Sequence, residues 1–570
     1  MSLSKKNIKM KIITCLKKLL IVFAFLVIGY GCSEDFLEKP LYNDLNSSTF
    51  YQTEDDFKAA IIACYEVFSW YGSRAAGLQG WLYRINYTLT DLSHPGGYGG
   101  PESEMEPLWD YRFDGSITRV FVRPYRGFYS AIMRSNTILE QIQDADIDEQ
   151  IKKTITAEAK FCRAFSHFFL ARMYGDVPLI DYVPTDDRLY PERTPAIEIY
   201  DFIIEDIENS YMDLPTSWSG TNLGRATQGA AMMLLSKTYL TKAGYILDPK
   251  TGTWAKEMDQ NQMNWEGALR WAQAIIDLNE YSLWQDEDVS AYQGAIPSDW
   301  ANADKVESGY QMNFWTENDG DLHDKESIFE VQYYSIWPDR YANGNLTQEG
   351  SNTNDFDLSF ESGIAEYGYN SNHPRSAFVD SYEEGDKRKL ATILAPGDTL
   401  WLRQWSPDWE NEEGYYVHDG ELGPYPTVMG SEGYIVKKWL YGRPDERESS
   451  PVNEVVWRYA EVLLIKAEAL NELGRTSEAY EAINQVRKRA GLGDLTPGLS
   501  RDDFREAVYE ERKFELAYEK KRWFDAVRTG KLIEWVLADR TVPIQQYHYI
   551  LPLPTEIVDL NDNLYQNFGF

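Results

Sequence analysis

The chain contains 570 residues, of which 43% are hydrophobic and 14% aromatic, and this apolar content excludes a largely disordered protein. Its 90 Asp and Glu outnumber its 56 Lys and Arg, so the net charge is −34 at pH 7. A negative field of this size repels phosphate backbones, and we therefore exclude nucleic-acid binding as the main function. The four cysteines, at positions 15, 32, 64 and 162, are too few for a disulfide framework.

The N-terminal segment has the pattern of an export signal. Residues 1–18 carry six lysines and no acid, and residues 19–28 form an uninterrupted apolar run. This run is about half the length of the roughly 20 residues that a membrane-spanning helix needs. The pattern therefore predicts a cleaved signal and argues against a permanent transmembrane helix.

The residues after the apolar run predict lipid attachment. Small Gly29 and Gly31 precede Cys32, an arrangement similar to a bacterial lipoprotein signal. We expect a signal peptide over 1–31 and a mature chain over 32–570, with acyl chains on Cys32 as a stable membrane anchor. An ordinary secretory signal with an incidental cysteine is the alternative.

The residues that follow Cys32 indicate where the anchored chain goes. Ser33, Glu34 and Asp35 resemble the acidic signal that sends some Gram-negative lipoproteins to the outer face of the outer membrane. We therefore expect a lipid-anchored outer-membrane protein on the surface of a Gram-negative bacterium.

Beyond the signal, apolar residues recur at helical spacing over much of the chain. The periodicity predicts helices over 54–68, 125–143, 152–174, 195–210, 226–244, 263–279, 454–473, 476–490, 502–520 and 521–537. The pairs around 230–272 and 467–483 resemble tetratricopeptide repeats, which place small residues where two helices cross. One hairpin cannot bury its own apolar face, so we expect a stack of helical hairpins. A set of unrelated packed helices is the alternative.

Two aromatic, irregular regions interrupt the helical pattern. The region 284–450 is rich in Gly, Asn, Asp, Ser and Pro, contains eight tryptophans, and includes short β-like runs such as 328–333. A second irregular stretch covers 70–118. Long irregular segments in compact proteins are usually functional. We therefore predict a single body with a helical scaffold at about 50–283 and 451–540 and a ligand-binding insertion at about 284–450.

Several blocks of the sequence resemble the SusD/RagB family of outer-membrane nutrient-binding lipoproteins. Residues 32–40, Cys-Ser-Glu-Asp-Phe-Leu-Glu-Lys-Pro, resemble the opening of the family after its lipid cysteine. Further blocks similar to family motifs cover 157–165, 174–179, 224–231, 458–469, 483–491, 511–525 and 551–567. The Arg, Glu and Asn residues of these motifs are expected to lie buried between helices, where they pair and cap. The motifs thus identify the scaffold rather than the ligand.

The resemblance implies a mainly α fold, with a tetratricopeptide-like scaffold and with long loops and short β-segments on the ligand face. It implies non-catalytic capture of a nutrient, most often a neutral oligosaccharide, and delivery to a SusC-like TonB-dependent transporter barrel. Aromatic loops agree with such a ligand, because sugar rings stack their apolar faces on aromatic rings. The residues at the places where family members line their site are Trp109, Tyr98, Trp300, Trp315 and Trp337 for stacking, Asp91 and Tyr310 for hydrogen bonds to hydroxyls, and Arg375.

Motifs of other chemistries are absent from the sequence. It contains no G-x-S-x-G, H-E-x-x-H, Walker A or G-x-G-x-x-G pattern, so we expect no catalytic residue, cofactor or metal site. The acid-rich stretches 317–324 and 352–357 have the composition of Ca²⁺ loops but not EF-hand spacing, and we expect them to be solvated. Two other functions stay open: a peptide-binding lipoprotein of the same fold, and a secreted glycan-cleaving enzyme. The enzyme would need a carboxylate pair that the sequence alone cannot locate among 90 acids.

Overall fold

The computed structural model describes residues 50–68, 82, 84–95, 105–258, 262–292, 308–314, 325–332, 372–406, 409–417, 433–436, 438 and 453–570. Nearly all of these residues belong to one compact unit, Gln52–Phe570. Helices dominate this unit, which confirms the mainly α fold. The boundary predicted between scaffold and insertion stays a prediction.

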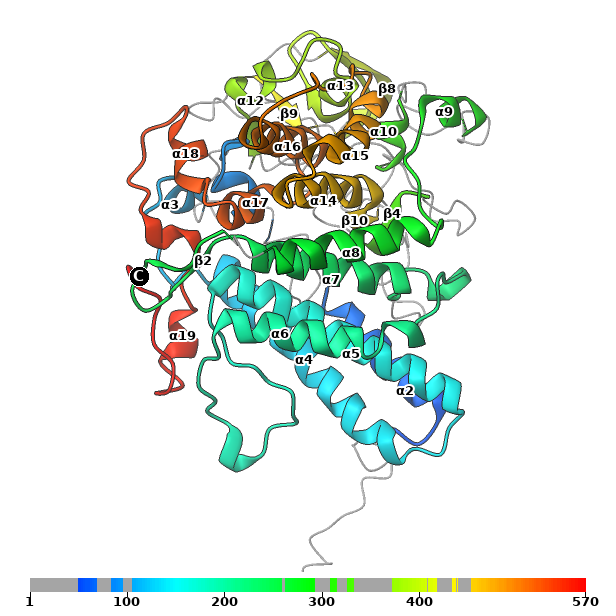
Figure 1. Cartoon of the computed structure of the whole chain (residues 1–570), viewed down its shortest axis with the longest axis vertical. Coiled ribbons are helices and arrows are strands. Elements are labelled where there is room, and N and C mark those ends of the chain that lie inside the picture. The colour runs from blue at the N-terminus through cyan, green and yellow to red at the C-terminus, as the bar shows by residue number, and fades with distance from the viewer. Residues whose placement is uncertain are drawn as a thin grey trace, which may run out of the picture. The chain divides into compact units, whose positions relative to one another are not determined.

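The longer helices form antiparallel hairpins that stack on one another. They are α2 (Glu54–Glu66), α4 (Arg123–Gln141), α5 (Glu149–Tyr174), α6 (Ala196–Glu208), α7 (Gln228–Ala243), α8 (Met263–Asp277), α14 (Tyr459–Glu472), α15 (Thr476–Arg489) and α16 (Arg501–Glu515). Figure 1 shows the stack running from α2, α4, α5 and α6 through α7 and α8 to α14, α15 and α16. This stacking confirms the hairpin scaffold, in which each pair covers the apolar face of the next.

Local residues set the ends of these helices. At the start of α2, the Thr53 hydroxyl accepts a hydrogen bond from the Asp56 amide, and the Asp56 carboxylate accepts one from the Thr53 amide at 2.8 Å. The Asp148 carboxylate caps α5 in a similar way. At its other end, Gly175 has a φ of 74°, a left-handed conformation that glycine adopts without strain.

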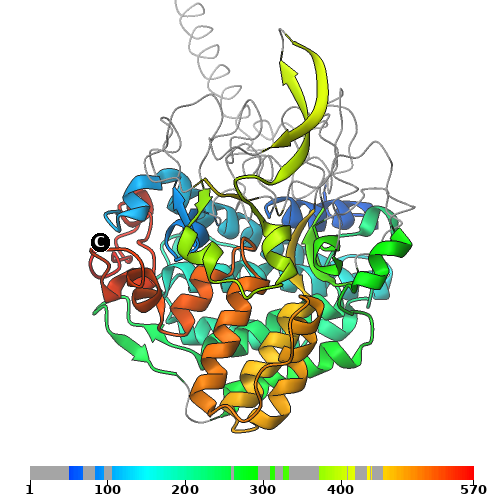
Figure 2. The same ribbon diagram turned by 90° about the horizontal axis from the view of Figure 1, so that it is seen from above.

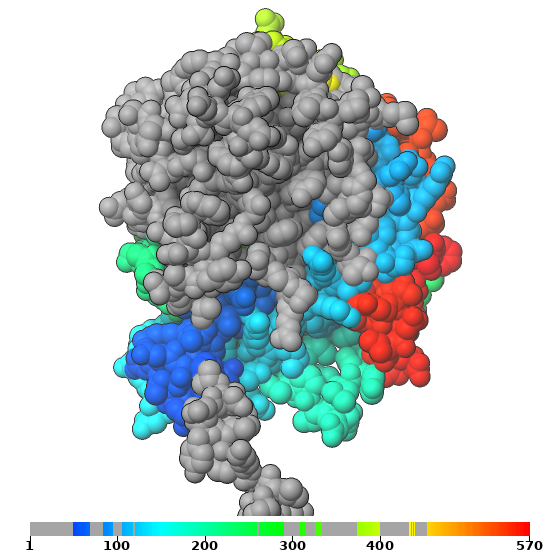
Figure 3. Space-filling view, turned by 180° about the vertical axis from the view of Figure 1, so that it is seen from behind, coloured from blue at the N-terminus to red at the C-terminus, as the bar shows by residue number. Residues whose placement is uncertain are grey.

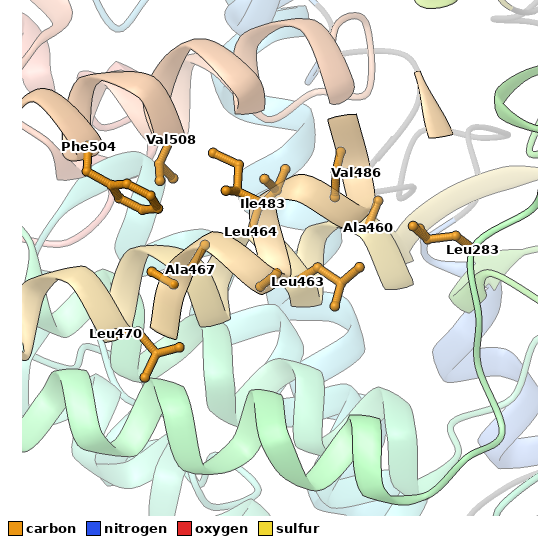
Figure 4. Packing of buried hydrophobic residues seen from close by; sticks show 12 residues of the cluster. Leu283, Ala460, Leu463, Leu464, Ala467, Leu470, Ile483, Val486, Phe504 and Val508 are labelled. Carbon is orange, nitrogen blue, oxygen red and sulfur yellow. The ribbon is translucent and has the colours of Figure 1, made fainter. Parts of the chain in front are cut away.

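Buried aliphatic residues hold α14, α15 and α16 together. Small Ala467, Ala479 and Ala482 are fully or almost fully buried where α14 crosses α15, so the two backbones can approach closely. Figure 4 shows Leu464, Ile483, Val486, Phe504 and Val508 in the space between the three helices, whereas Leu470 lies on the side of α14 that faces α8. This packing is the core that the repeat-like spacing predicts.

The predicted helix 454–473 begins later than expected. Its first five residues form strand β10 (Glu454–Arg458), which pairs antiparallel with β4 (Ser327–Val331). Strand β4 contains most of the predicted β-like run. Val455, Val456 and Trp457 favour a strand, and the partner lies more than a hundred residues away, so tertiary pairing overrides the local helical pattern.

The predicted helices 502–520 and 521–537 are also interrupted. Helix α16 ends at Glu515, and Tyr518 and Lys520 follow with positive φ angles of 58° and 59°. The second segment divides into α17 (Arg522–Arg528) and α18 (Leu532–Leu537), because Gly530 turns the chain with a φ of 72°.

The strands make two-stranded antiparallel pairs wherever the structure describes them. Besides β10–β4, these pairs are β1 (Ser93–Pro95) with β5 (Asn372–Pro374), β2 (Ile246–Leu247) with β3 (Trp254–Lys256), β6 (Ile393–Leu394) with β9 (Ile435–Val436), and β7 (Thr399–Ser406) with β8 (Trp409–Val417). Figure 2 shows the β7–β8 hairpin extending beyond the helices. No helix among the described residues is long and apolar enough to cross a membrane.

The motif arginines and glutamates lie inside the scaffold, as the motifs predict. The Arg458 guanidinium, 1% exposed, donates to Glu326 at 2.7 Å and to Glu519 at 2.8 Å, and also contacts Glu515. Burial opposes the charge of Glu515, but Arg489 and Arg458 outweigh it and lower its pKa to about 2. Buried charges of this kind are tolerated because oppositely charged groups surround them.

Candidate functional site

Trp109, one of the predicted ligand residues, lies at the end of the short helix α3 (Met105–Trp109) and is partly exposed. The Arg540 guanidinium carbon lies 3.9 Å from the centre of the indole, and that of Arg375 lies 5.2 Å away. The His94 ring is tilted against the indole at a centroid distance of 4.7 Å. We call Trp109, His94, Arg375 and Arg540 the Trp109 cluster.

Three segments far apart in the sequence build the Trp109 cluster. His94 belongs to β1, Arg375 follows β5, and Arg540 follows α18. In the β1–β5 pair His94 lies opposite His373, and the Arg375 amide donates to the Leu92 carbonyl at 3.0 Å. On the face shown in Figure 3, the light-blue segment after residue 105 lies beside the orange-red and red C-terminal segments. The cluster, whose four residues are all partly buried, is thus made by tertiary contacts.

Buried residues of α3 and of the chain that follows it pack beside the Trp109 cluster. Met105 and Leu108 of α3 are buried, and Tyr111 turns the backbone with a φ of 52°. The Tyr111 hydroxyl donates to the Leu89 carbonyl at 2.7 Å, and burial raises the pKa of this tyrosine. The His548 ring packs edge-on against Tyr111 at 5.1 Å, and its burial lowers its pKa to about 4. His548 is therefore neutral at pH 7 and adds no charge beneath the cluster.

The two arginines of the cluster differ in how they are neutralised. Arg375 donates to the Asp539 carboxylate at 2.7 Å and to the Asp539 carbonyl at 3.2 Å. Arg540 donates to the Thr88 carbonyl at 3.4 and 3.5 Å and shares a side-chain hydrogen bond with Tyr111, and its buried Nε has no hydrogen-bond partner in the described structure. No described carboxylate forms an ion pair with Arg540. Asp539 thus pairs with Arg375 and attracts Arg540 without forming an ion pair with it.

Asp91, predicted to bond a ligand hydroxyl, is engaged by the protein. Both of its carboxylate oxygens accept hydrogen bonds from Arg522, at 2.7 and 2.8 Å. Burial opposes the charge of Asp91, but Arg522 outweighs it and holds the pKa of Asp91 below its usual value. The Arg522 guanidinium in turn lies 3.6 Å from the centre of the Trp535 ring.

Tyr310 lies in the scaffold interior rather than at a surface. It is fully buried, its hydroxyl donates to the Glu515 carbonyl at 3.0 Å, and it accepts from Lys438 at 2.7 Å. This placement argues against the predicted contact with a ligand, because the hydroxyl is inaccessible and already bonded. Four further predicted residues, Tyr98, Trp300, Trp315 and Trp337, lie outside the described residues, as does Cys32.

A concave surface of about 680 Å³ lies between α8, α14 and α15. Leu269, Leu470 and Leu473 contribute its apolar part, and charged residues such as Arg270 and Glu481 line its rim. None of the described residues that line it is aromatic. It therefore lacks the flat rings that a sugar stacks on, and we place the candidate glycan site at the Trp109 cluster instead.

Metal binding has no candidate among the described residues. They contain no group of three or more His, Cys, Asp or Glu positioned to hold an ion. The acid-rich stretches 317–324 and 352–357 lie outside the described ranges.

The sequence predicts Trp109 and Arg375 as ligand residues, and the structure brings these two together with Arg540 and His94, which the sequence does not single out. His94 was visible at the start of a Gly-rich aromatic run, which was a usable signal. Arg540 has none, because it meets Trp109 only after the chain returns from α18, more than 400 residues later.

Two family models match the chain. The model described as the SusD family matches residues 300–570, and one described as starch-binding associating with outer membrane matches residues 111–240. Two SusD-like proteins of Formosa agariphila are similar over nearly the whole chain. One is 27% identical, covering 97% of this chain and 99% of the relative, and the other is 24% identical, covering 96% and 98%.

Solved structures share the fold. A SusD-like protein from Bacteroides fragilis is 23% identical, with a TM-score of 0.71 over 94% of this chain and all of that one. A laminarin-binding SusD-like protein is 23% identical with a TM-score of 0.66, covering 91% of this chain and 100% of its own. A surface glycan-binding protein A from Bacteroides thetaiotaomicron, in complex with laminarihexaose, is 20% identical with a TM-score of 0.67, over 90% and 100%.

Proposed function

Because this chain belongs to the SusD/RagB family, we propose that it binds an oligosaccharide or polysaccharide at the cell surface and passes it to a TonB-dependent transporter without cleaving it. The lipid anchor at Cys32 and the SusC-like barrel are parts of this proposal. The description of the second family model, which names starch binding and the outer membrane, supports it. So do the names of two structural neighbours, which refer to laminarin and laminarihexaose.

The observation that carries the proposal is the partly exposed indole of Trp109, with two guanidinium groups over the ring and the His94 imidazole beside it. An aromatic ring offers a flat apolar surface to the C–H face of a sugar, and guanidinium and imidazole groups bond its hydroxyls. Arg540 covers part of the indole, so a sugar would contact the exposed remainder of the ring and the adjoining N–H groups.

The charges around the site favour binding over hydrolysis. Glycoside hydrolysis needs two carboxyl groups beside the scissile bond, one of them an acid with a raised pKa. Three carboxylates close in sequence to the cluster residues each lie beside an arginine: Asp91 beside Arg522, Asp539 beside Arg375, and Asp110 beside Arg112 at 3.7 Å. The pKa of Asp91 is lowered, which is the wrong direction for a general acid.

A glycan array probed with the full-length lipoprotein in detergent tests the proposal. We expect binding to at least one glycan, no release of shorter sugars on prolonged incubation, and about tenfold weaker binding by Trp109→Ala. Trp535→Ala is the matched control, because it removes an indole that also carries a guanidinium. Cleavage of a glycan would favour the enzyme, and peptide binding without any glycan binding would favour the peptide-binding alternative.

A further inference from the structure

We propose that Arg540 is an anion-binding residue and that the saccharide bound at the Trp109 cluster carries a carboxylate or sulfate group. This inference rests on the proposed function for the ligand being a saccharide. It departs from the neutral oligosaccharide that the family resemblance implies.

The first step is the bonding of Arg540 compared with other arginines. A guanidinium has five N–H donors, and a partly buried one usually finds acceptors for them. Arg193 also lacks a carboxylate among the described residues, but it donates to the Asp176 carbonyl at 2.7 Å, to the Tyr565 carbonyl at 2.8 Å and to the Asn567 side chain at 2.6 Å. Arg540 has two long bonds to a single carbonyl and a side-chain hydrogen bond with Tyr111. Its bonding capacity is therefore largely unused.

The second step is how the Arg540 guanidinium is held. Its carbon lies 3.9 Å from the Trp109 ring centre and 5.4 Å from the Tyr111 ring centre, so aromatic rings fix its position. A guanidinium held over a ring keeps its N–H groups at its edge available. Such a planar fork matches a carboxylate or a sulfate with two parallel hydrogen bonds. Because the group is half-buried, such a pair is less weakened by water than one on an open surface.

The third step is the local charge balance. The chain as a whole is strongly acidic, yet charges beyond about 8 Å are largely screened at physiological salt. Within the cluster Asp539 neutralises Arg375, while Arg540 has no such partner among the described residues. An anionic group on the ligand would complete the second pair.

The competing interpretation is that Arg540 only fastens the segment after α18 onto α3. Both roles use the same stack of guanidinium and indole, so a loss of stability alone cannot separate them. A ligand series in which only the charge varies can separate them.

The test uses glucose, glucuronate and glucose 6-sulfate with the full-length lipoprotein in detergent at constant ionic strength. Binding is followed by saturation-transfer NMR. We expect the wild type to bind at least one of the two anionic sugars about tenfold more tightly than glucose. Which anion is preferred distinguishes a carboxylate from a sulfate. Arg540→Gln should abolish the preference, and Arg540→Lys should keep part of it as a point charge.

Arg270→Gln is the matched control, since Arg270 lies 4.8 Å over Trp271 on an exposed surface far from the cluster in sequence. It should leave the preference intact. If Arg540→Gln does not fold, two measurements still test the inference. The anion preference should be reduced in Arg540→Lys, and the binding of anionic sugars by the wild type should weaken as NaCl is added. Equal binding of all three sugars by the wild type, an anion preference that added NaCl leaves unchanged, or a preference that survives in Arg540→Gln, would overturn the inference.

The array separates this inference from the proposed function. Binding of a neutral glycan that Trp109→Ala weakens and Arg540→Gln leaves unchanged would remove the anion site and keep the glycan-binding function. An array without any glycan binding would remove both.

Discussion

Trp535 and Trp109 each have an arginine over the indole ring. Only the arginine over Trp535 forms an ion pair with a described carboxylate. Arg522 lies over Trp535 and is held by both oxygens of Asp91, whereas Arg540 lies over Trp109 without a carboxylate among the described residues. The stacking is similar, so the difference lies in charge. A paired stack fastens the chain, and an unpaired stack at a surface also has donors left for a ligand.

Several arginines of the scaffold interior are paired with carboxylates, as Arg522 is, although Arg172 lies 3.7 Å over Phe524 without an ion pair among the described residues. Arg163, Arg225 and Arg458 are buried and each meets at least one carboxylate within 3 Å. A buried cation without a partner is costly, so pairing is the expected state. The following predictions test whether pairing separates scaffold arginines from the candidate ligand-binding arginine, from the largest expected effect to the smallest.

Breaking the interior network should cost the most. Arg458→Met leaves Glu326, Glu515 and Glu519 buried with fewer cations, and we expect the free energy of unfolding to fall by about 3–5 kcal/mol. Urea denaturation measures this. Arg475→Met is the control, because Arg475 pairs with Glu478 on the surface, where water screens the pair, and its loss should cost far less. Equal losses in the two variants would show that burial does not set the value of these pairs.

Acid should lower the free energy of unfolding, because His548, which packs against Tyr111 near the Trp109 cluster, is buried in its neutral form. His548 has a pKa of about 4 in the fold because it is buried, against about 6.5 in an unfolded chain. Between these values the unfolded state binds the extra proton, so stability falls as the pH drops from about 6.5 towards 4. From pH 7 to pH 4.5 we expect this residue to account for a loss of about 2 kcal/mol. Denaturation of wild type and His548→Gln at both pH values measures it, and a pH dependence that is the same in both would contradict the prediction.

Breaking the paired stack should have an intermediate effect. Arg522→Met leaves the Asp91 carboxylate partly buried without its cation, at an expected cost of about 2 kcal/mol. The pKa of Asp91, measured by NMR, should rise because its attraction to Arg522 is lost. Adding Asp91→Asn to this variant should recover part of the stability. If the double variant is less stable than Arg522→Met, the loss comes from the stack rather than from the stranded charge.

Removing the unpaired arginine should have the smallest effect on folding. Arg540→Met strands no described carboxylate and keeps a flexible side chain over Trp109, so we expect a loss of less than about 1 kcal/mol. The midpoint of thermal unfolding beside that of Arg522→Met measures the difference. A loss as large as that of Arg522→Met would assign Arg540 to the scaffold.

The sequence by itself determined the helical hairpins and the family. Helical spacing and small residues at crossings act within a few residues of each other, so they can be read in order along the chain. The same holds for the motif arginines and glutamates, whose burial was expected. Trp109 and Arg375 were predicted as site residues because they fall at places that line the site in the family.

Only the tertiary structure decided which of these residues meet. In the structure residues 454–458 form a strand, and Tyr310 is buried in the interior. Asp91 pairs with Arg522, and Arg540 lies over the Trp109 ring. Each of these outcomes depends on a contact between segments that are more than a hundred residues apart. Such contacts are set by the packing of the whole scaffold, and no local spacing or composition encodes them.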